Sequence, residues 1–323
     1  MKAPRYHGVD LAYGLLLFFV VALGTANAQN SELYYFKDYF NVIFDGALGA
    51  FLFLNAFLLH KKSVSSVQHS LLRAARYRAI VILILGVVLS FLYPDNLLLL
   101  IGICMLIGSV LCQLNTSIII TVLILASLGS YVVYFAQDTV QNTSSSFIIN
   151  RIEGFLYTGK FSVLPWVCVY LVGLFCSRMF LFNNRRTSLV SGFLLILIGA
   201  VSSVWNGPTT PSYSILPGLQ WFFPSFLIYA SGLGVLVWTL FGSKSYPKWT
   251  KPLSVVGSMR YTVLVLATFF QSIMLLFVKE PVMIVVIWQL VLISIIIFVF
   301  IYFWRKQYTL GPVERMFRSQ QQG

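Results

Sequence analysis

Few side chains in this sequence could do acid–base chemistry, and Asp45 is the most informative of them. It lies in the segment FDGALGA (residues 44–50), near one end of a long apolar run at residues 42–60. A carboxylate at membrane depth costs free energy, so it usually faces a polar cavity and often serves function. Two interpretations stay open: Asp45 is a functional carboxylate, or it lies close enough to the headgroups to be solvated.

The other candidates are charged residues that could bind anions. Arg73, Arg76 and Arg78 precede an apolar run, and guanidinium groups pair bidentately with phosphates such as those of a nucleotide-containing donor. Lipid headgroups and membrane topology explain the same cluster more simply. Arg5 and Asp10 flank the first apolar run. They form either an ion pair at a helix N-terminus or part of the mouth of a site.

Other familiar catalytic patterns are absent from the sequence. None of the histidines, His7, His60 and His69, has an acid beside it within an apolar run, and a catalytic base needs a partner. The four cysteines have no metal-binding spacing. There is no P-loop, dinucleotide-binding loop, nucleophile elbow or zinc motif. We therefore expect no metal ion.

The amino-acid composition predicts which secondary-structure elements carry these residues. The chain has 323 residues, of which 59% are hydrophobic and 10% charged, with a mean hydropathy of +0.86. Soluble domains carry about 25% charged residues, which excludes a cytosolic enzyme, a disordered chain and a nucleic-acid-binding module. We predict an all-α polytopic integral membrane protein, a single domain over residues 1–323 with about ten transmembrane helices. The apolar runs are 11–28, 42–60, 77–93, 97–114, 116–136, 164–181, 188–204, 221–242, 258–278 and 282–304.

The cations predict the orientation of these helices. If the N-terminus is cytoplasmic, 18 of the 22 Lys and Arg residues fall in inner segments, as the positive-inside rule requires. The topology is then N-in/C-in. A rival interpretation is that the first run is a signal peptide cleaved after the small residues at 25–28, which leaves nine spans. Asp10 at the start of that run favours retention of the first helix.

Several stretches in order along the chain look like motifs of one family. They are RYHGVDLAYG (5–14), Asp45 with FLFL (51–54), RYR (76–78), PDNL (94–97), IGI (101–103), GKFSVLPW (159–166) with Gly173 and Arg178, Gly257-x-Met259-x-x-Thr262, Gln271-Ser272, and GPVER (311–315). Together they resemble the transmembrane acyltransferase superfamily. The nearest branch is the bacterial proteins similar to heparan-α-glucosaminide N-acetyltransferase, with their relatives of unknown function.

The resemblance implies transfer of an acyl group, such as acetyl, across a bacterial plasma (inner) membrane. The donor substrate is then cytoplasmic acetyl-CoA or another acyl-CoA, and the acceptor is a sugar or lipid-linked group at the outer face. The partners are membrane lipids and that glycan or lipid-linked acceptor, with no nucleic acid. Asp45 becomes the general base or orients one, while Arg5, Asp10, Arg73 and Arg78 belong to the donor site.

Two departures from the family pattern keep other functions open. The family's Asp-x-x-Arg-Gly has Tyr13 in place of the arginine. Characterised members use a histidine in the outer segment before the second span. Counting back from Asp45 without gaps puts Tyr35 roughly there, which makes Tyr35 the second catalytic candidate. A different acceptor, a displaced catalytic group or loss of catalysis are all open. A lipid or solute transporter (flippase) and a non-catalytic membrane subunit are the alternatives.

Overall fold

The computed structural model describes most of the chain, and every structural statement below concerns those residues. They are residues 7–28, 34–63, 68–90, 97–140, 163–179, 184–205, 223–242, 246–247, 250–277 and 283–316.

The described residues are almost entirely helical, and none of them is in a strand. The helices are α1 (His7–Ala28), α2 (Tyr34–Ser63), α3 (Gln68–Ser90), α4 (Leu97–Leu111), α5 (Thr116–Val140), α7 (Val163–Arg178), α8 (Arg185–Trp205), α9 (Phe223–Phe241), α10 (Lys251–Ser258), α11 (Arg260–Phe277), α12 (Met283–Gln307) and α13 (Pro312–Met316). Each apolar run coincides with a helix, so the all-α prediction is confirmed. The short helices α10 and α13 were not predicted. The number of membrane crossings stays a prediction.

Prolines mark the beginning of several helices. Pro165, Pro224 and Pro252 lie in the first turn of α7, α9 and α10, and Pro312 is the first residue of α13. The first N–H groups of a helix have no partner within the helix, so proline loses nothing there and its fixed φ suits the helix. The same residue in the middle of a helix would break the hydrogen-bond ladder.

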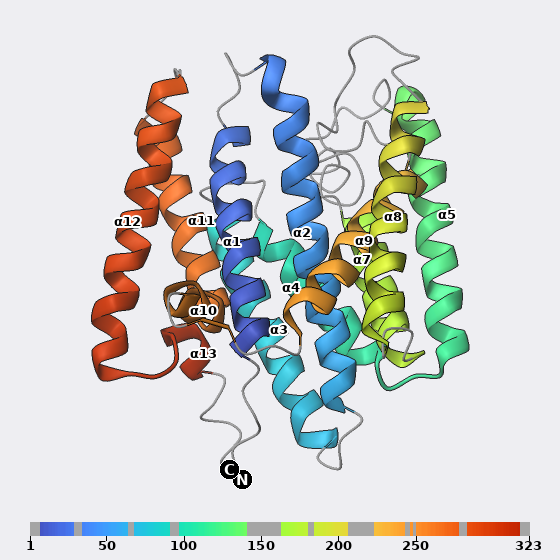
Figure 1. Cartoon of the computed structure of the whole chain (residues 1–323), viewed down its shortest axis with the longest axis horizontal. Helices are drawn as coiled ribbons and strands as arrows, with labels where there is room; N and C mark the ends of the chain where they lie inside the picture. Colours follow the sequence, from blue (N-terminus) through green and yellow to red (C-terminus); the bar gives the residue numbers. More distant parts are fainter. Residues whose placement is uncertain are drawn as a thin grey trace.

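Helix α2 runs through the centre of the bundle (Figure 1). It packs against α1, α7 and α9, while α8 packs on α9, α5 on α7, and α3 on α4. Every residue of α2 from 45 to 58 is buried. In Figure 1, α12 lies at one side of the bundle and α5 at the other. The central helix therefore crosses the whole core, and any site inside the bundle is built around it.

The outer helices expose large apolar side chains. The exposed fraction is 62% for Leu125, 61% for Phe193 and 68% for Trp288. We call the exposed apolar residues of these helices the apolar belt; its members include Ile124, Leu125, Leu128 and Val132 of α5, Val190, Phe193, Leu197 and Val201 of α8, and Trp288, Ile295, Val299 and Phe303 of α12. Soluble monomers rarely expose apolar surface on this scale, and such surfaces mark contact with membrane or protein.

Few of the helices, taken one at a time, are both long enough and apolar enough to span a membrane. Among the described residues, Arg185–Ser202 of α8 is long and apolar enough to cross a bilayer. Helices α10 and α11 meet the criterion as a pair, although the chain bends by 81° between them. Shorter apolar stretches, with 10–17 described residues each, lie in α1, α2, α4, α5, α7 and α9.

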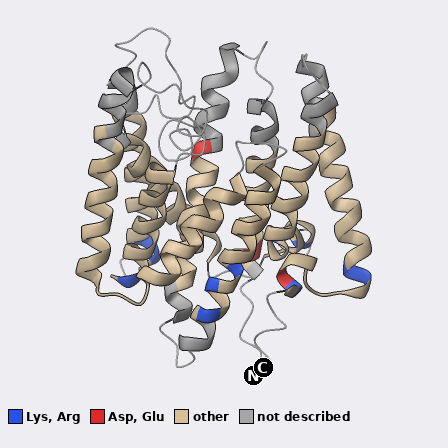
Figure 2. Cartoon of the chain, turned by 180° about the vertical axis from the view of Figure 1, so that it is seen from behind, with Lys and Arg blue, Asp and Glu red and all other residues tan. Residues whose placement is uncertain are grey.

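The cations whose side chains the structure describes gather at one end of the bundle, the end where α10 and α13 lie (Figure 2). They are Arg73, Arg76, Arg78, Arg178, Arg185, Arg186, Lys251, Arg260, Arg305, Lys306 and Arg315, and the sequence assigns all of them to inner segments. We call this the inner end and the opposite one the outer end. This sorting is what the positive-inside rule requires; the N-in/C-in topology itself stays a prediction.

The backbones of α1 and α10 touch at two glycines. A Cβ on Gly257 would collide with the carbonyl oxygen of Asp10 and lie 2.6 Å from the nitrogen of Gly14. A Cβ on Gly14 would collide with the carbonyl oxygen of Leu253. Larger side chains at either position would therefore separate the two helices. This contact fixes α10 across the inner end of α1.

Helix α13 caps the beginning of α11. The Glu314 carboxylate accepts hydrogen bonds from the backbone N–H of Tyr261 (2.7 Å) and of Thr262 (3.2 Å). It also accepts one from the Thr262 hydroxyl (2.5 Å). A carboxylate at a helix N-terminus satisfies free N–H groups and complements the helix dipole. The motifs around Thr262 and Glu314, which are about 50 residues apart in the sequence, form one junction.

We expect Gly257→Val to destabilise the protein by about 2 kcal/mol or more, because overpacking costs about 1–3 kcal/mol and the colliding atoms here are backbone. Gly129→Ala is the control, since a Cβ there has its nearest neighbour at 4.0 Å and alanine favours a helix. Thermal unfolding of the detergent-purified variants measures the difference. Equal unfolding midpoints for the two variants would contradict the α1–α10 contact.

We expect Glu314→Ala to cost about 2 kcal/mol of stability, because each hydrogen bond to a charged group contributes about 1.5–3 kcal/mol and some are replaced by water. Glu314→Gln keeps one acceptor oxygen and is expected to lose less. The same unfolding measurement ranks the three proteins. A Gln variant as unstable as the Ala variant would show that the cap does not depend on an acceptor at this position.

Impermeant maleimide tests the topology. The four native cysteines are buried and can be replaced, and single cysteines introduced at the exposed positions Arg186 and Arg305 report on the inner end. Both are expected to resist labelling in intact cells and to react in inverted membrane vesicles. Labelling of either position in intact cells would overturn the N-in/C-in assignment.

Candidate functional site

Arg260 is the centre of a polar cluster at the inner end. It is the first residue of α11, directly after the bend that follows α10. Its guanidinium carbon lies 4.2 Å from the ring centroid of Tyr13 and 4.8 Å from that of Tyr261. Both contacts are within cation–π range. The Tyr13 side chain is fully buried, so the guanidinium is fixed against the interior of the bundle.

A chain of hydrogen bonds joins this centre to α2. The Tyr261 hydroxyl donates to Oδ1 of Asn55 at 3.0 Å. The Asn55 amide in turn donates to the carbonyl oxygen of Phe51 at 2.8 Å. Asn55 is buried, and its two hydrogen bonds satisfy a group that would otherwise be costly at this depth. Helices α2 and α11 are thus tied together beside Arg260.

Two of the predicted donor-site residues join the cluster. Asp10 of α1 lies within electrostatic reach of Tyr13 and Arg260. Arg78 of α3 lies within reach of Arg260, Tyr261 and Glu314. We call these residues the inner polar cluster; its members are Asp10, Tyr13, Asn55, Arg78, Arg260, Tyr261 and Glu314. Although position 13 is not arginine, a guanidinium does lie on the Tyr13 ring, and it comes from α11.

The other two predicted donor-site residues are not brought into the cluster. Arg73 is exposed, and five residues along a helix turn it by about 140° from Arg78, toward a different face of α3. Arg5 lies outside the described residues. Arg76 donates instead to the Gln113 side chain at 2.5 Å. The arginines of α3 therefore lie in different surroundings, Arg78 at the inner polar cluster and Arg73 on the surface.

Some buried donor atoms of the inner polar cluster lack an acceptor among the described residues. The Tyr13 hydroxyl and Nε of Arg260 are both buried, and neither makes a hydrogen bond with any residue that the structure describes. Buried polar atoms are nearly always paired, and an unmet one costs about 1–3 kcal/mol. A group that accepts hydrogen bonds would satisfy these two atoms.

Asp45 lies in the half of α2 nearer the outer end, and it is only 6% exposed. One aromatic neighbour comes from α9. A Cβ on the adjacent Gly46 would lie 3.0 Å from the Tyr229 hydroxyl, and Asp45 acts electrostatically on Tyr229. This burial favours the functional interpretation of Asp45 over a solvated carboxylate. Tyr35 lies nearly three helical turns before Asp45, and its side chain is outside the described residues, so its role stays a prediction.

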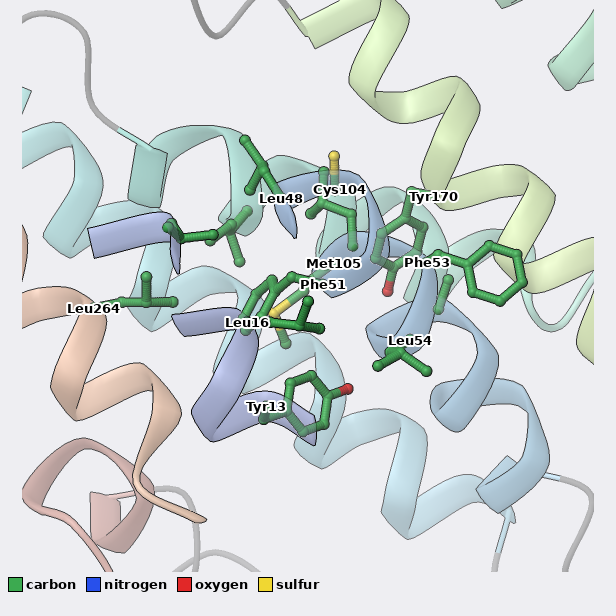
Figure 3. Close-up of a cluster of buried hydrophobic side chains, with 14 of the residues drawn as sticks. Tyr13, Leu16, Leu48, Phe51, Phe53, Leu54, Cys104, Met105, Tyr170 and Leu264 are labelled. Carbon is green, nitrogen blue, oxygen red and sulfur yellow. The ribbon is translucent and has the colours of Figure 1, made fainter. Parts of the chain in front are cut away.

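The interior between Asp45 and the inner polar cluster is apolar. Asp45 and Asn55 are about 15 Å apart along α2, and the residues between them are all apolar and buried. Figure 3 shows Leu16, Leu48, Phe51 and Met105 packed above Tyr13, with the Tyr13 and Phe51 rings 5.4 Å apart. The polar path through the helices that the acyl-transfer hypothesis requires is not present along this stretch of α2.

No group of three or more His, Cys, Asp or Glu side chains in the described residues could hold a metal ion. All four cysteines are buried and free, as expected for small packing residues.

Sequence reasoning missed Arg260, Tyr261, Asn55 and Tyr229. In the sequence, Arg260 contributes only to the count of cations on the inner side. The residues next to it in the sequence do not predict that its side chain contacts α1. The available signal was the glycine at position 257 just before it, which marks a close backbone approach. Asn55 was the other signal, since an amide in a long apolar run needs a partner.

Comparison with known proteins agrees with the family inferred from the motifs. No curated protein and no solved structure matches the chain. Residues 5–204 match the family described as "Heparan-alpha-glucosaminide N-acetyltransferase, catalytic". The match covers more than half of the 323 residues and includes Asp10, Asp45 and Arg78, but not Arg260. The chain therefore belongs to the heparan-α-glucosaminide N-acetyltransferase catalytic family, a family of membrane acetyltransferases.

Proposed function

We propose that this chain is a membrane-embedded acyltransferase of a bacterial plasma (inner) membrane. It moves an acyl group, most simply acetyl, from a cytoplasmic acyl-CoA to a hydroxyl or amine of a sugar or lipid-linked acceptor at the outer face. The observation that supports this function best is the catalytic-family match over residues 5–204. That segment contains Asp45 and four members of the inner polar cluster, Asp10, Tyr13, Asn55 and Arg78.

The apolar belt and the cation-rich inner end support the membrane location. Apolar side chains on α5, α8 and α12 face outward, where acyl chains of lipids would contact them. The cations at the inner end (Figure 2) would meet the anionic lipids of the cytoplasmic leaflet. Membrane lipids are thus the first partners that we propose.

The inner polar cluster is the proposed donor site. Arg78 would bind donor phosphate, because arginine offers several N–H donors in a planar fork. Asp10 belongs to the same site through its electrostatic contact with Arg260. Arg5 and Arg73 would extend the site toward the cytoplasm, where the exposed side chain of Arg73 can meet a donor before it enters.

Asp45 is the proposed general base. The acceptor oxygen or nitrogen attacks the thioester carbonyl carbon while Asp45 takes the proton from that atom. The carbon–sulfur bond then breaks, and CoA leaves as its thiol after taking up a proton. A base in position contributes about 10²–10⁴ to the rate, and alignment of the two reactants supplies a further large share. Tyr35 remains the second catalytic candidate.

The apolar interior sets a condition on this mechanism. A donor held at the inner polar cluster must bring its acyl group about 15 Å along α2 to reach Asp45. Leu48 and Phe51 fill that distance and are almost fully buried. An acyl arm can pass only when such side chains move, so the described conformation is a closed one. Closure between turnovers would also keep water away from the thioester.

A transporter or flippase is the second candidate, and one observation favours it. Helices α10 and α11 are apolar together but bend by 81° at Met259, and interrupted helices are typical of transporter sites. A non-catalytic subunit is the third candidate, because the expected histidine is absent from segment 29–41.

Asp45→Asn tests the acyl-transfer mechanism. The amide cannot accept the proton, so we expect transfer from radiolabelled acetyl-CoA to membrane glycan or lipid to fall at least about 100-fold. The variant should keep the wild-type elution profile and unfolding midpoint, because the substitution keeps the shape of the side chain. Gly129→Ala is the activity control and is expected to work as the wild type does. Full transfer activity in Asp45→Asn would remove Asp45 from the role of base.

The same membranes separate the three candidate functions. Covalent label on a glycan or lipid supports the acyltransferase. Uptake or flipping of a substrate without covalent change would support the transporter instead. A deletion strain with unchanged acylation of surface glycans and lipids, and no transport defect, would leave the non-catalytic subunit.

A further inference from the structure

We propose that Arg260 and Tyr13 form a phosphate-binding position in the inner polar cluster. The ligand is a phosphate oxyanion of the nucleotide-containing acyl thioester. This inference rests on the proposed function, and it assigns donor binding to a residue beyond the family-matched segment 5–204. It also makes the C-terminal part of the chain necessary for a complete site.

The chemistry of the two unpaired atoms selects the ligand class. Nε of Arg260 can only donate a hydrogen bond, and the Tyr13 hydroxyl is a donor that lacks an acceptor among the described residues. A ligand that satisfies both must supply acceptor oxygens, and a negative charge strengthens both bonds. Phosphate has the acceptors and the charge, whereas a sugar hydroxyl has no charge.

Contacts with two aromatic rings order the Arg260 side chain before any ligand binds. Its guanidinium lies against two tyrosine rings, at 4.2 Å and 4.8 Å, which limits its rotation. Tyr261 is itself held by Asn55. A side chain that is ordered before binding loses less conformational entropy when the ligand arrives. The two ring contacts therefore hold the hydrogen-bond donors of Arg260 in a fixed direction.

The beginning of α11 does not compete for the ligand. Glu314 already accepts the N–H groups of Tyr261 and Thr262, so the helix terminus is satisfied from within the chain. The ligand would bind to side chains beside this terminus. Glu314 thus has a structural role at the helix terminus, while Arg260 contacts Tyr13 and Tyr261.

The charges around the position are balanced without a ligand. Arg260 of α11 interacts electrostatically with Asp10 of α1, and Arg78 of α3 interacts with Glu314 of α13. Two buried guanidinium groups would be costly without carboxylates nearby. We assign Asp10 the role of a positioning residue, which holds Arg260 in place and shares it with the phosphate when the donor binds.

The test compares Tyr13→Phe and Arg260→Gln with the control Arg305→Gln, an exposed arginine of α12 at the same end. The full-length protein is placed in nanodiscs of neutral lipid, and binding of radiolabelled coenzyme A is measured. We expect roughly ten-fold weaker binding for Tyr13→Phe and roughly 30-fold or more for Arg260→Gln, since one hydrogen bond to a charged group changes affinity about ten-fold or more. Arg305→Gln should bind as the wild type does.

Two further arms make the result specific. Pantetheine, which lacks phosphate, is expected to compete equally weakly in every variant. The unfolding midpoint of ligand-free Tyr13→Phe should equal or exceed that of the wild type, because the lost hydroxyl has no described partner. A lower midpoint together with unchanged coenzyme A affinity would identify Tyr13 as a structural residue only and overturn the proposal. Because Tyr13→Phe keeps the ring under Arg260, it carries the test if Arg260→Gln does not fold.

Other outcomes separate this inference from the proposed function. Wild-type coenzyme A affinity in both variants overturns the phosphate position, even if acetyl transfer is found. Arg260-dependent binding of coenzyme A without transfer to any acceptor supports the position and counts against the enzyme. If nanodiscs containing phosphatidylglycerol abolish coenzyme A binding and raise the unfolding midpoint in an Arg260-dependent way, the phosphate comes from lipid, and the donor assignment is wrong.

Discussion

The close contact between α1 and α10 determines where the inner polar cluster can form. Gly257 brings its backbone onto the carbonyl of Asp10, and the chain then bends by 81° before α11 begins. Arg260 follows only three residues after this contact, so its side chain reaches the Tyr13 ring on α1. A longer side chain at position 257 would move α10 outward and carry Arg260 with it. The position of the Arg260 guanidinium therefore depends on the absence of a side chain at Gly257.

Helix α2 connects the two polar centres of the molecule. Asn55 is bonded to Tyr261 at the inner polar cluster, and Asp45 lies about 15 Å away on the same helix. Both residues lie on one uninterrupted helix, so the distance between the two centres is set by α2. The glycines and alanines around Asp45 allow α9 to approach, as seen where Gly46 meets Tyr229 and Gly49 meets Ala230. Movement of α2 is therefore constrained by α9 at one centre and by α11 at the other.

Sequence patterns predicted local structure well and spatial relations only in part. Continuous apolar runs predicted the helices, because in an apolar environment a helix satisfies its own backbone. The motif order predicted the family, and burial favours the functional interpretation of Asp45. Asp10 and Arg78 were predicted as one site and are close to Arg260. Arg260 itself was not predicted to belong to that site, because its contact with Tyr13 joins positions almost 250 residues apart in the sequence. Helix α10 was also missed, since eight residues that include Pro252 and Gly257 have too little apolar periodicity to be recognised.

The replacement of arginine at position 13 illustrates how a charge can be kept while its place in the sequence changes. An arginine on α1 would have to be buried beside Asp10, with its long side chain confined among Leu16, Leu17 and Phe51, all of them buried. Tyrosine at that position fills the same interior with a ring, and the ring provides a face on which a guanidinium from α11 can rest. The charge then enters from the first residue of α11, directly after the bend that follows α10. The arrangement keeps the cation next to Asp10, and it makes the site depend on α10, α11 and α13 being docked. The proposed binding position at the inner end would therefore be lost if the C-terminal helices did not dock on α1.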